Sequence, residues 1–437
     1  MQHNLIDKQL VDSTMAQCGA NNLDNASIRD IVKIANLLEK ATGEKFIRME
    51  MGVPGLPPSQ IGTKAEIEAL KQGVAQFYPM LEGLPALSQE ASRFVKNFMD
   101  IDINPGSIIP TVGSMQASYT AFMAVTECKK GQDTMLFIDP GFPVQKTQME
   151  VIGKPYITFD IYEYRGKKLE TKLREYLDKG NIAGIVYSNP NNPSWVCLTE
   201  EELQIIGKLA TEYDVIVLED LAYFAMDFRK DLSHPGEAPF QPTVAKYTDN
   251  YIFMISSSKL FSYAGQRLGL LCVSDSLFKR EYPHLQERYH AAQLGYTLTY
   301  KLIYTFTSGT AHSPQYAVAA ILKAANEGTL NILADVREYG LRAKTMKKLY
   351  TDAGFKVVYD KDGDEPVADG FYFTIMYPGM TGAELAHELL YYGISSITLK
   401  GCGSSREGLR ACVSQISMDQ MEPLKERIER FRKDHEK

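Results

Sequence analysis

Apolar residues in the middle of the chain fall into short runs, and the stretches between some of these runs have the spacing of amphipathic helices. The runs predict seven β-strands, at residues 107–111, 134–138, 156–161, 182–188, 215–219, 251–256 and 268–273. Several runs are continuously apolar, which is typical of parallel strands covered on both faces. The alternation of strands and helices predicts an α/β fold, with a large domain whose mostly parallel sheet is sandwiched by helices.

One helix has a distinct start. Glu202 follows Thr199 at the spacing of a capping box, in which the two residues satisfy each other's backbone N–H groups. We expect this helix to run from Thr199 to about Tyr213. In sheets of this kind ligands bind beyond the carboxyl ends of the strands, so the residues at those ends are the candidates for chemistry.

The pattern changes from about residue 315. Helical spacing at 315–327 and 330–353 leads into short strand-like runs at 356–359 and 371–376, and a charged helical segment follows Met418. This succession of helical and strand-like segments predicts a smaller α+β domain. We expect an N-terminal segment, 1–50, that contributes to the small domain, a large domain, 51–312, and a small C-terminal domain, 313–437.

Composition and charge narrow the class of protein. The 437 residues are 44% apolar and 23% charged, as in soluble globular proteins, and the formal net charge of −7 gives no footprint for nucleic acid. No apolar run is long enough to span a membrane, and the first residues lack a signal-peptide core, so we expect a cytoplasmic protein. The six cysteines lack disulfide or metal-ligand spacing, and Cys272 and Cys412 are expected in the core. No metal site is expected.

A serine-rich segment with one lysine follows the apolar run at 251–255. It reads Ser256-Ser-Ser-Lys259, and Arg267 follows within a glycine-bearing loop. A lysine can condense with an aldehyde as a Schiff base, and an arginine can fork onto a phosphate. Together they indicate pyridoxal 5′-phosphate, although such a segment on its own is more often a solvated turn.

Other strand ends carry groups that suit the same ligand. Gly113-Ser-Met115 leads from a strand into a helix, whose free N–H groups suit a phosphate; an ordinary helix cap is the alternative. The ring of Phe142 can stack on a pyridine, and Asn192 can direct an amide inward. The Asp220 carboxylate can hold a pyridine nitrogen protonated. Each of these residues also has an ordinary structural explanation, so the prediction of a cofactor site depends on their occurring together, in this order.

Over about residues 45–415 the chain resembles the class I/II aminotransferases, pyridoxal-phosphate enzymes of fold type I. The motifs that carry the resemblance are Tyr78-x4-Gly83-Leu-Pro, Gly113-Ser-Met-Gln, Asn191-Asn-Pro, Asp220-Leu-Ala-Tyr223, Ser256-Ser-Ser-Lys259 with Arg267, and Leu409-Arg410. Each motif is weak alone, but chance is a poor explanation for their order and spacing. Two sites depart from the family: Ser194 and Trp195 replace its usual Thr-Gly, and Ser88 replaces a common arginine.

The resemblance implies a role around the cofactor for each matching residue of the large domain. Lys259 would form the internal aldimine and later shuttle a proton, and Asp220 would pair with the pyridine nitrogen. Tyr223 and Asn192 would bond the phenolic oxygen. Further residues would hold the phosphate or cover the ring, namely Ser114, Met115, Ser256, Arg267 and Phe142.

The same resemblance implies substrate and partner contacts. Arg410 would bind the substrate's α-carboxylate as a bidentate fork, with Asn192 and the segment at Gly52 nearby. Tyr78 would reach the phosphate of the neighbouring subunit, which implies a homodimer with shared active sites. No partner of another kind, neither nucleic acid nor membrane, is expected.

The expected activity is that of an aminotransferase, which moves an amino group from an L-amino acid to a 2-oxo acid. A C–S β-lyase on the same scaffold is the alternative, and a cofactor-binding regulatory protein is a third reading, disfavoured because residues 1–50 show no helix-turn-helix and no basic cluster. The substrate side chain is not readable from the sequence. Tyr296, Tyr300 and Tyr304 suggest an aromatic pocket, although core packing is the more common reason for such residues.

Overall fold

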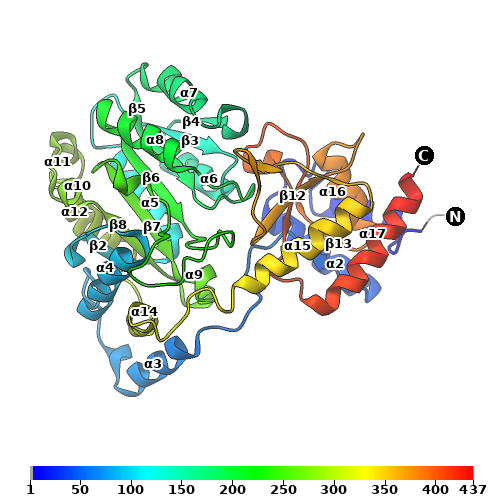
Figure 1. Ribbon diagram of the computed structural model, residues 1–437, viewed down its shortest axis with the longest axis horizontal. Coiled ribbons are helices and arrows are strands. Elements are labelled where there is room, and N and C mark those ends of the chain that lie inside the picture. The colour runs from blue at the N-terminus through cyan, green and yellow to red at the C-terminus, as the bar shows by residue number, and fades with distance from the viewer. Residues whose placement is uncertain (1–2, 437) are drawn as a thin grey trace.

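The computed structural model describes residues 3–436, in which two lobes are joined side by side (Figure 1). The larger lobe has a seven-stranded sheet in the order β2-β8-β7-β6-β5-β3-β4. Its strands are β2 (Ile108–Val112), β3 (Thr134–Asp139), β4 (Tyr156–Asp160), β5 (Ile182–Ser188), β6 (Ile216–Leu221), β7 (Tyr251–Ser256) and β8 (Leu268–Val273). In this sheet β8 runs in the opposite direction to the other six strands, so the expected mostly parallel sheet is confirmed.

Each predicted strand of this sheet is present, and the ends differ by no more than two residues. The largest difference is at β6, which continues to Leu221, so that Asp220 lies within the strand instead of after it. Every residue of β3, β6, β7 and β8 is buried. This burial explains why the sequence runs are continuously apolar.

Helices cover both faces of the large sheet. Neighbouring residues of β6 point to opposite faces: Val217 packs into one apolar cluster and Leu218 into the other. The first cluster includes residues of α4 (Pro85–Met99), α7 (Lys168–Leu177), α8 (Glu200–Glu212) and α14 (His312–Asn326). The second includes residues of α5 (Gly113–Val125), α6 (Pro143–Ile152), α10 (Asp275–Lys279) and α11 (Pro283–Tyr289). The capping box of Thr199 and Glu202 starts α8 as expected.

The smaller lobe has a four-stranded antiparallel sheet in the order β14-β15-β12-β9. Its strands are β9 (Lys356–Val357), β12 (Tyr372–Met376), β14 (Ile397–Thr398) and β15 (Leu409–Cys412). Helices α15 (Arg337–Asp352), α16 (Gly382–Leu390) and α17 (Met421–His435) lie in the same lobe (Figure 1). Cys412 on β15 and Cys272 on β8 are fully buried, as predicted.

The N-terminal part of the chain joins the smaller lobe. Its elements are α1 (Lys8–Gln17), α2 (Ile28–Thr42) and β1 (Ile47–Arg48). Strand β1 pairs in parallel with β13 (Ile394–Ser395). This pairing is what the expected assignment of residues 1–50 requires. The division at residues 50 and 51 stays a prediction.

Two details near the join of the lobes differ from the expectation. The helix expected at 330–353 begins only at Arg337, because the preceding residues form turns, one of them closed by a bond from the Leu333 N–H to the Asn331 side chain. Helix α14 packs along α3 (Gln60–Lys71) and α4 of the larger lobe. The Gln315 side chain there accepts the Leu84 N–H at 2.7 Å. We therefore propose that the small domain begins after α14, and not at residue 313.

Among residues 3–436, no helix is both long enough and apolar enough to cross a membrane.

Candidate active site

A cavity of about 710 Å³ lies where the carboxyl ends of the large sheet meet the smaller lobe. Of the residues that the sequence assigns to a site, every one except Tyr78 lines this cavity. They are Gly52, Ser114, Met115, Phe142, Asn192, Asp220, Tyr223, Ser256, Lys259, Arg267 and Arg410. A cavity of this size is typical of small-molecule and cofactor sites. The fold thus brings together residues that are up to 358 positions apart (410 − 52) in the chain.

Lys259 lies in the short helix α9 (Ser257–Leu260), directly after β7. Its Nζ donates a hydrogen bond to the carbonyl oxygen of Gly52. Burial lowers the pKa of Lys259 to about 8, and the positive charges of Arg410 and Arg267 act in the same direction. An amine with such a pKa is neutral in about a tenth of the molecules at pH 7, far more than an ordinary lysine, and a nucleophile or a proton acceptor requires the neutral form.

Asp220 is a buried carboxylate at the end of β6. It accepts hydrogen bonds from the Ala222 N–H at 3.0 Å and from the Gln145 amide at 2.9 Å. Burial raises its pKa to about 6, against these two bonds. Among residues 3–436 no lysine, arginine or histidine forms an ion pair with it. A buried carboxylate of this kind favours a cation, such as a protonated ring nitrogen, in the cavity.

One corner of the cavity suits a phosphate. Helix α5 starts at Gly113, and no side chain caps this N-terminus. The first-turn N–H groups of Ser114 and Met115 therefore have no partner within the helix. The Arg267 guanidinium packs so closely over Gly113 that a Cβ there would lie 2.5 Å from Nη2. Ser256, whose Oγ accepts the Ser258 N–H at 3.2 Å, lines the same cavity.

Arg410 is almost fully buried, with 1% of its surface exposed. It donates to the Asn192 side-chain oxygen at 3.3 Å and to the carbonyl oxygen of Glu50. Its Nε has no hydrogen-bond partner in the described chain, and no carboxylate of residues 3–436 forms an ion pair with it. A buried guanidinium without an anion is costly, so this side chain suits a carboxylate that arrives with a ligand.

Tyr372 is a site residue that the sequence did not reveal. Its hydroxyl and that of Tyr223 lie 2.6 Å apart, and the Arg410 guanidinium lies 4.7 Å from its ring centre. Gly52 is needed beside it, because a Cβ there would lie 2.1 Å from the Tyr372 hydroxyl. Tyr372 therefore connects the Tyr223 hydroxyl with the guanidinium of Arg410.

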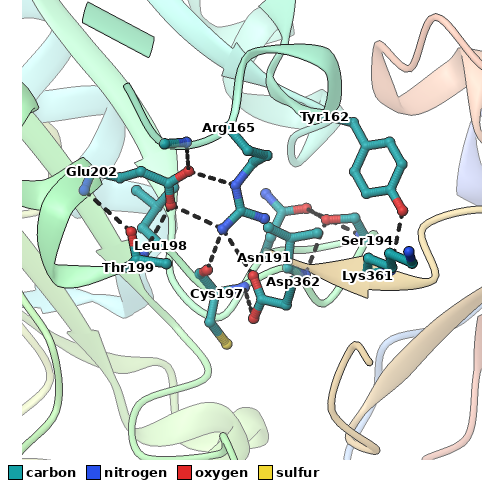
Figure 2. A network of polar contacts seen from close by, with 12 residues as sticks. Tyr162, Arg165, Asn191, Ser194, Cys197, Leu198, Thr199, Glu202, Lys361 and Asp362 are labelled. Atoms are coloured by element: carbon teal, nitrogen blue, oxygen red, sulfur yellow. Dashed lines mark hydrogen bonds and ion pairs between the residues drawn. The ribbon is translucent and has the colours of Figure 1, made fainter. Parts of the chain in front are cut away.

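The loop that carries Asn192 is held by a buried polar network (Figure 2). Arg165 donates to Glu202 and to Asp362, both at 2.9 Å, and Asp362 accepts the Cys197 N–H at 3.1 Å. Asp362 belongs to the β10 (Lys361–Asp362) and β11 (Glu365–Pro366) hairpin. The network thus fixes the loop after β5 from both sides, which places the Asn192 side chain at the cavity.

The two family departures in this loop have structural consequences. Ser194 keeps a hydroxyl, which donates to the Asn191 side chain at 2.6 Å. Trp195 has a φ of 63°, the left-handed region that favours glycine. Its ring is fully buried, with its centroid 5.3 Å from that of Tyr223 and 6.1 Å from that of Tyr372. Trp195 thus forms a rigid wall behind these two tyrosines.

Tyr78 lies apart from the site, with 89% of its surface exposed. Phe77 and Met80 beside it are also exposed, at 61% and 59%. Nor do the tyrosines at 296, 300 and 304 line the cavity, so in this single chain the suggested aromatic pocket is not formed by them.

A family model for aminotransferases of class I and II matches residues 44–428. The chain belongs to this family. It is 28% identical to an aspartate aminotransferase of Pyrococcus horikoshii over 56% of this chain and 61% of that protein. It is 27% identical to the glutamate–pyruvate aminotransferase AlaC of Escherichia coli, over 73% of this chain and 71% of that protein. The chain thus spans about three fifths of the length of the Pyrococcus relative that it matches.

Solved structures share the fold over most of the chain. An alanine aminotransferase from Pyrococcus furiosus superposes with a TM-score of 0.76 at 22% identity, covering 93% of this chain and 97% of that one. An aspartate aminotransferase from Thermotoga maritima gives 0.74 at 18% identity, covering 96% and 98%. The fold is therefore that of the fold-type I aminotransferases.

The cofactor of this family is pyridoxal 5′-phosphate, and the residues present fit it. The buried amine of Lys259 suits its aldehyde, and the unpaired carboxylate of Asp220 suits its ring nitrogen. The uncapped start of α5, beside Arg267, suits its phosphate.

Proposed function

We propose that this protein is a pyridoxal-phosphate-dependent aminotransferase that moves an amino group from an L-amino acid to a 2-oxo acid. One observation carries the proposal: a lysine whose pKa is lowered to about 8 shares a cavity with an unpaired buried carboxylate and an unpaired buried arginine. Amino-group chemistry on a carboxylate-bearing substrate needs these three groups together.

Each of the three groups has a task. When bound, the cofactor would supply an electron sink for the electron pair left on the substrate's Cα. Asp220 would keep the ring nitrogen protonated, and Lys259 Nζ would accept the proton from Cα. Arg410 binds the α-carboxylate and so orients the Cα–H bond for proton loss.

The residues around these groups set the geometry. Tyr223 and Asn192 would bond the phenolic oxygen of the cofactor, and Ser114, Met115, Ser256 and Arg267 would hold its phosphate. Phe142 would cover the ring. Tyr223 is held in place by the hydrogen bond between its hydroxyl and that of Tyr372 and by the ring of Trp195, a residue with left-handed backbone conformation. The names of the relatives, which include aspartate, alanine and glutamate–pyruvate aminotransferases, support amino acids and 2-oxo acids as the substrates.

We also propose a homodimer in which Tyr78 completes the partner's phosphate site. The exposed side chains of Phe77, Tyr78 and Met80 support it, because an apolar cluster of this kind is typical of an interface. The molar mass in solution tests it: light scattering should give twice the 49.0 kDa of one chain. The cytoplasmic location expected from the sequence stays a prediction.

The activity is tested by incubating the loaded protein with a panel of amino donors and 2-oxoglutarate. Amino transfer that depends on the 2-oxo acid supports the proposal. Release of pyruvate and ammonia from cysteine conjugates without a 2-oxo acid would instead establish the β-lyase. Failure of every donor, with the cofactor bound, would overturn the proposal.

A further inference from the structure

The indole of Trp195 lies between the two lobes, behind the candidate active-site cavity. Its loop belongs to the larger lobe, and two residues of the smaller lobe enclose the ring. A Cβ on Gly370 would lie 2.0 Å from Cε2 of the indole, and the ring centroid of Tyr372 lies 6.1 Å away. Trp195 itself does not line the cavity. The ring therefore acts on the site only through the residues that it touches.

The loop holds the indole in this place although the backbone conformation is unfavourable. The φ of 63° is one that glycine, the usual residue of the family here, adopts without strain. The Trp195 N–H donates to the Asn191 carbonyl at 2.9 Å, and the Cys197 N–H donates to Asp362 at 3.1 Å, so the loop is fixed on both sides. The indole Nε1 has no hydrogen-bond partner among residues 3–436. What the side chain contributes to the site is therefore packing.

The packing acts on a pair of buried hydroxyls. Those of Tyr223 and Tyr372 lie 2.6 Å apart, and each ring meets the indole at a steep angle, 69° and 65°. Because all three rings are buried, the indole excludes water from behind the pair. Burial raises the pKa of Tyr223 well above its ordinary value, so its hydroxyl keeps its proton and can donate. The other titratable groups that face it are Arg410 and Cys412.

We propose that Trp195 is a positioning residue that keeps the Tyr223 hydroxyl directed at the cofactor's phenolic oxygen and away from water. The assignment rests on the contact proposed above between Tyr223 and that oxygen. A hydrogen bond to the oxygen is strongest when the nitrogen that joins the cofactor to Lys259 is unprotonated, because the oxygen is then most negative. The bond therefore lowers the pH at which this nitrogen loses its proton. Through Trp195, the packing of the smaller lobe influences that pH.

The test measures the pH midpoint of the change in visible absorbance of the cofactor-loaded protein. Trp195→Gly relaxes the backbone but removes the ring, so the two tyrosines gain room and water can enter behind them. The midpoint should rise by about 0.5–1 pH unit, the size expected when one neutral hydrogen bond weakens. Tyr223→Phe removes the bond itself and should raise the midpoint by at least as much.

A second variant displaces the indole without changing it. In Gly370→Ala the added methyl group meets the ring, which must shift, so the midpoint should rise. In the Trp195→Gly background the same substitution should add no further rise, because the indole no longer occupies that place. Gly370→Ala also tests the proposal if Trp195→Gly is poorly folded.

Phe431→Ala is the control for a void of similar size. Phe431 is a fully buried ring of α17 in the smaller lobe, and it does not line the cavity. The variant should unfold at a lower temperature and leave the midpoint unchanged.

The outcomes separate the role of Trp195 from the contact on which it rests. An unchanged midpoint in folded Trp195→Gly or in Gly370→Ala, or an equal rise in Phe431→Ala, would overturn the role of Trp195. An unchanged midpoint in Tyr223→Phe would disprove the proposed contact with the phenolic oxygen, and the role of Trp195 with it. A native protein that transfers no amino group, while its variants show the expected rises, would disprove only the proposed activity.

Discussion

The cofactor end of the cavity is built from strand ends of one sheet, whereas the substrate end is assembled from separate parts of the chain. Asp220 is the last residue but one of β6, Ser256 ends the neighbouring strand β7, and Lys259 lies in the short helix α9 that follows β7. Arg410 and Tyr372 come instead from the antiparallel sheet of the smaller lobe. If the proposed roles hold, the groups that bind the cofactor come mainly from the large sheet, while the groups that bind the substrate depend on how the lobes pack.

Polar contacts across the join of the lobes support the substrate end. The Tyr359 hydroxyl donates to Asp160 at 2.6 Å, and Arg165 bonds Asp362. Because these contacts tie the smaller lobe to the end of β4 and to the Asn192 loop, they hold the substrate-binding groups over the cofactor end. Substitutions at the two ends should consequently affect different steps: those at the cofactor end the chemical step, and those at the substrate end mainly the binding of the amino acid.

The largest effect is expected for Lys259→Ala. The cofactor end would lose both the covalent attachment and the proton acceptor, so kcat should fall by about 10⁴-fold or more. Amino-transfer assays measure this loss, and thermal unfolding checks that the fold is retained. Activity within tenfold of native would show that another group does the chemistry.

Asp220→Asn should lower kcat by about 10²–10⁴-fold, because a neutral amide cannot keep the ring nitrogen protonated. Glu219→Gln is the matched control. Glu219 is the adjacent buried carboxylate of β6. It accepts a hydrogen bond from the Tyr187 hydroxyl at 3.1 Å, and it does not line the cavity. Steady-state kinetics give kcat for both variants. An equal fall of kcat in the two would indicate damage to β6, and not the loss of a contact to the ring nitrogen.

Arg410→Lys should raise the free energy of the transition state by about 1–3 kcal/mol, since an ammonium cannot fork onto a carboxylate. The loss should show in kcat/KM for the amino donor, with cofactor loading unchanged, because Arg410 lies at the substrate end. An unaltered kcat/KM would remove Arg410 from substrate binding.

The rate at which the apoprotein takes up pyridoxal 5′-phosphate should depend on the state of Lys259. Only the neutral amine attacks an aldehyde. Because burial lowers the pKa of Lys259 from 10.5 to about 8, the rate should rise as the pH increases towards 8 and level off above about pH 9. Stopped-flow absorbance measures it. A rate that keeps rising beyond pH 10 would mean that the reacting lysine has an ordinary pKa.

The smallest effect is expected for Tyr372→Phe, which removes one hydrogen bond to Tyr223. The cost should be about 0.5–1.5 kcal/mol in kcat/KM. Tyr392→Phe is the control, because it also removes a hydrogen bond of a tyrosine hydroxyl, donated to the Asp434 carboxylate at 2.9 Å, elsewhere in the smaller lobe. A loss no greater than in this control would assign Tyr372 to packing alone.

The difference between the two ends also explains what the sequence could predict. The seven strands of the large sheet are readable because burial on both faces makes each one a continuous apolar run, and the residues at their ends can be named at once. Tyr372 was missed because its place depends on register: β12 pairs with β15 so that Tyr372 lies opposite Cys412, two residues from Arg410.

The start of α15 was mispredicted for a related reason, and the same reason leaves the lobe of α14 open in the sequence. Helical spacing alone does not tell which lobe a helix packs on, nor does it mark the turns before Arg337. The role proposed for Tyr78 requires a second chain. The sequence implies that second chain only through the family resemblance.

The claim that Lys259 is the cofactor-binding amine is tested most directly by borohydride reduction of the yellow, loaded protein followed by peptide mass mapping. We predict that the added mass of the reduced cofactor lies on the peptide that contains Lys259 and that Lys259→Ala protein carries none. The added mass on a different lysine of the native protein would contradict the account.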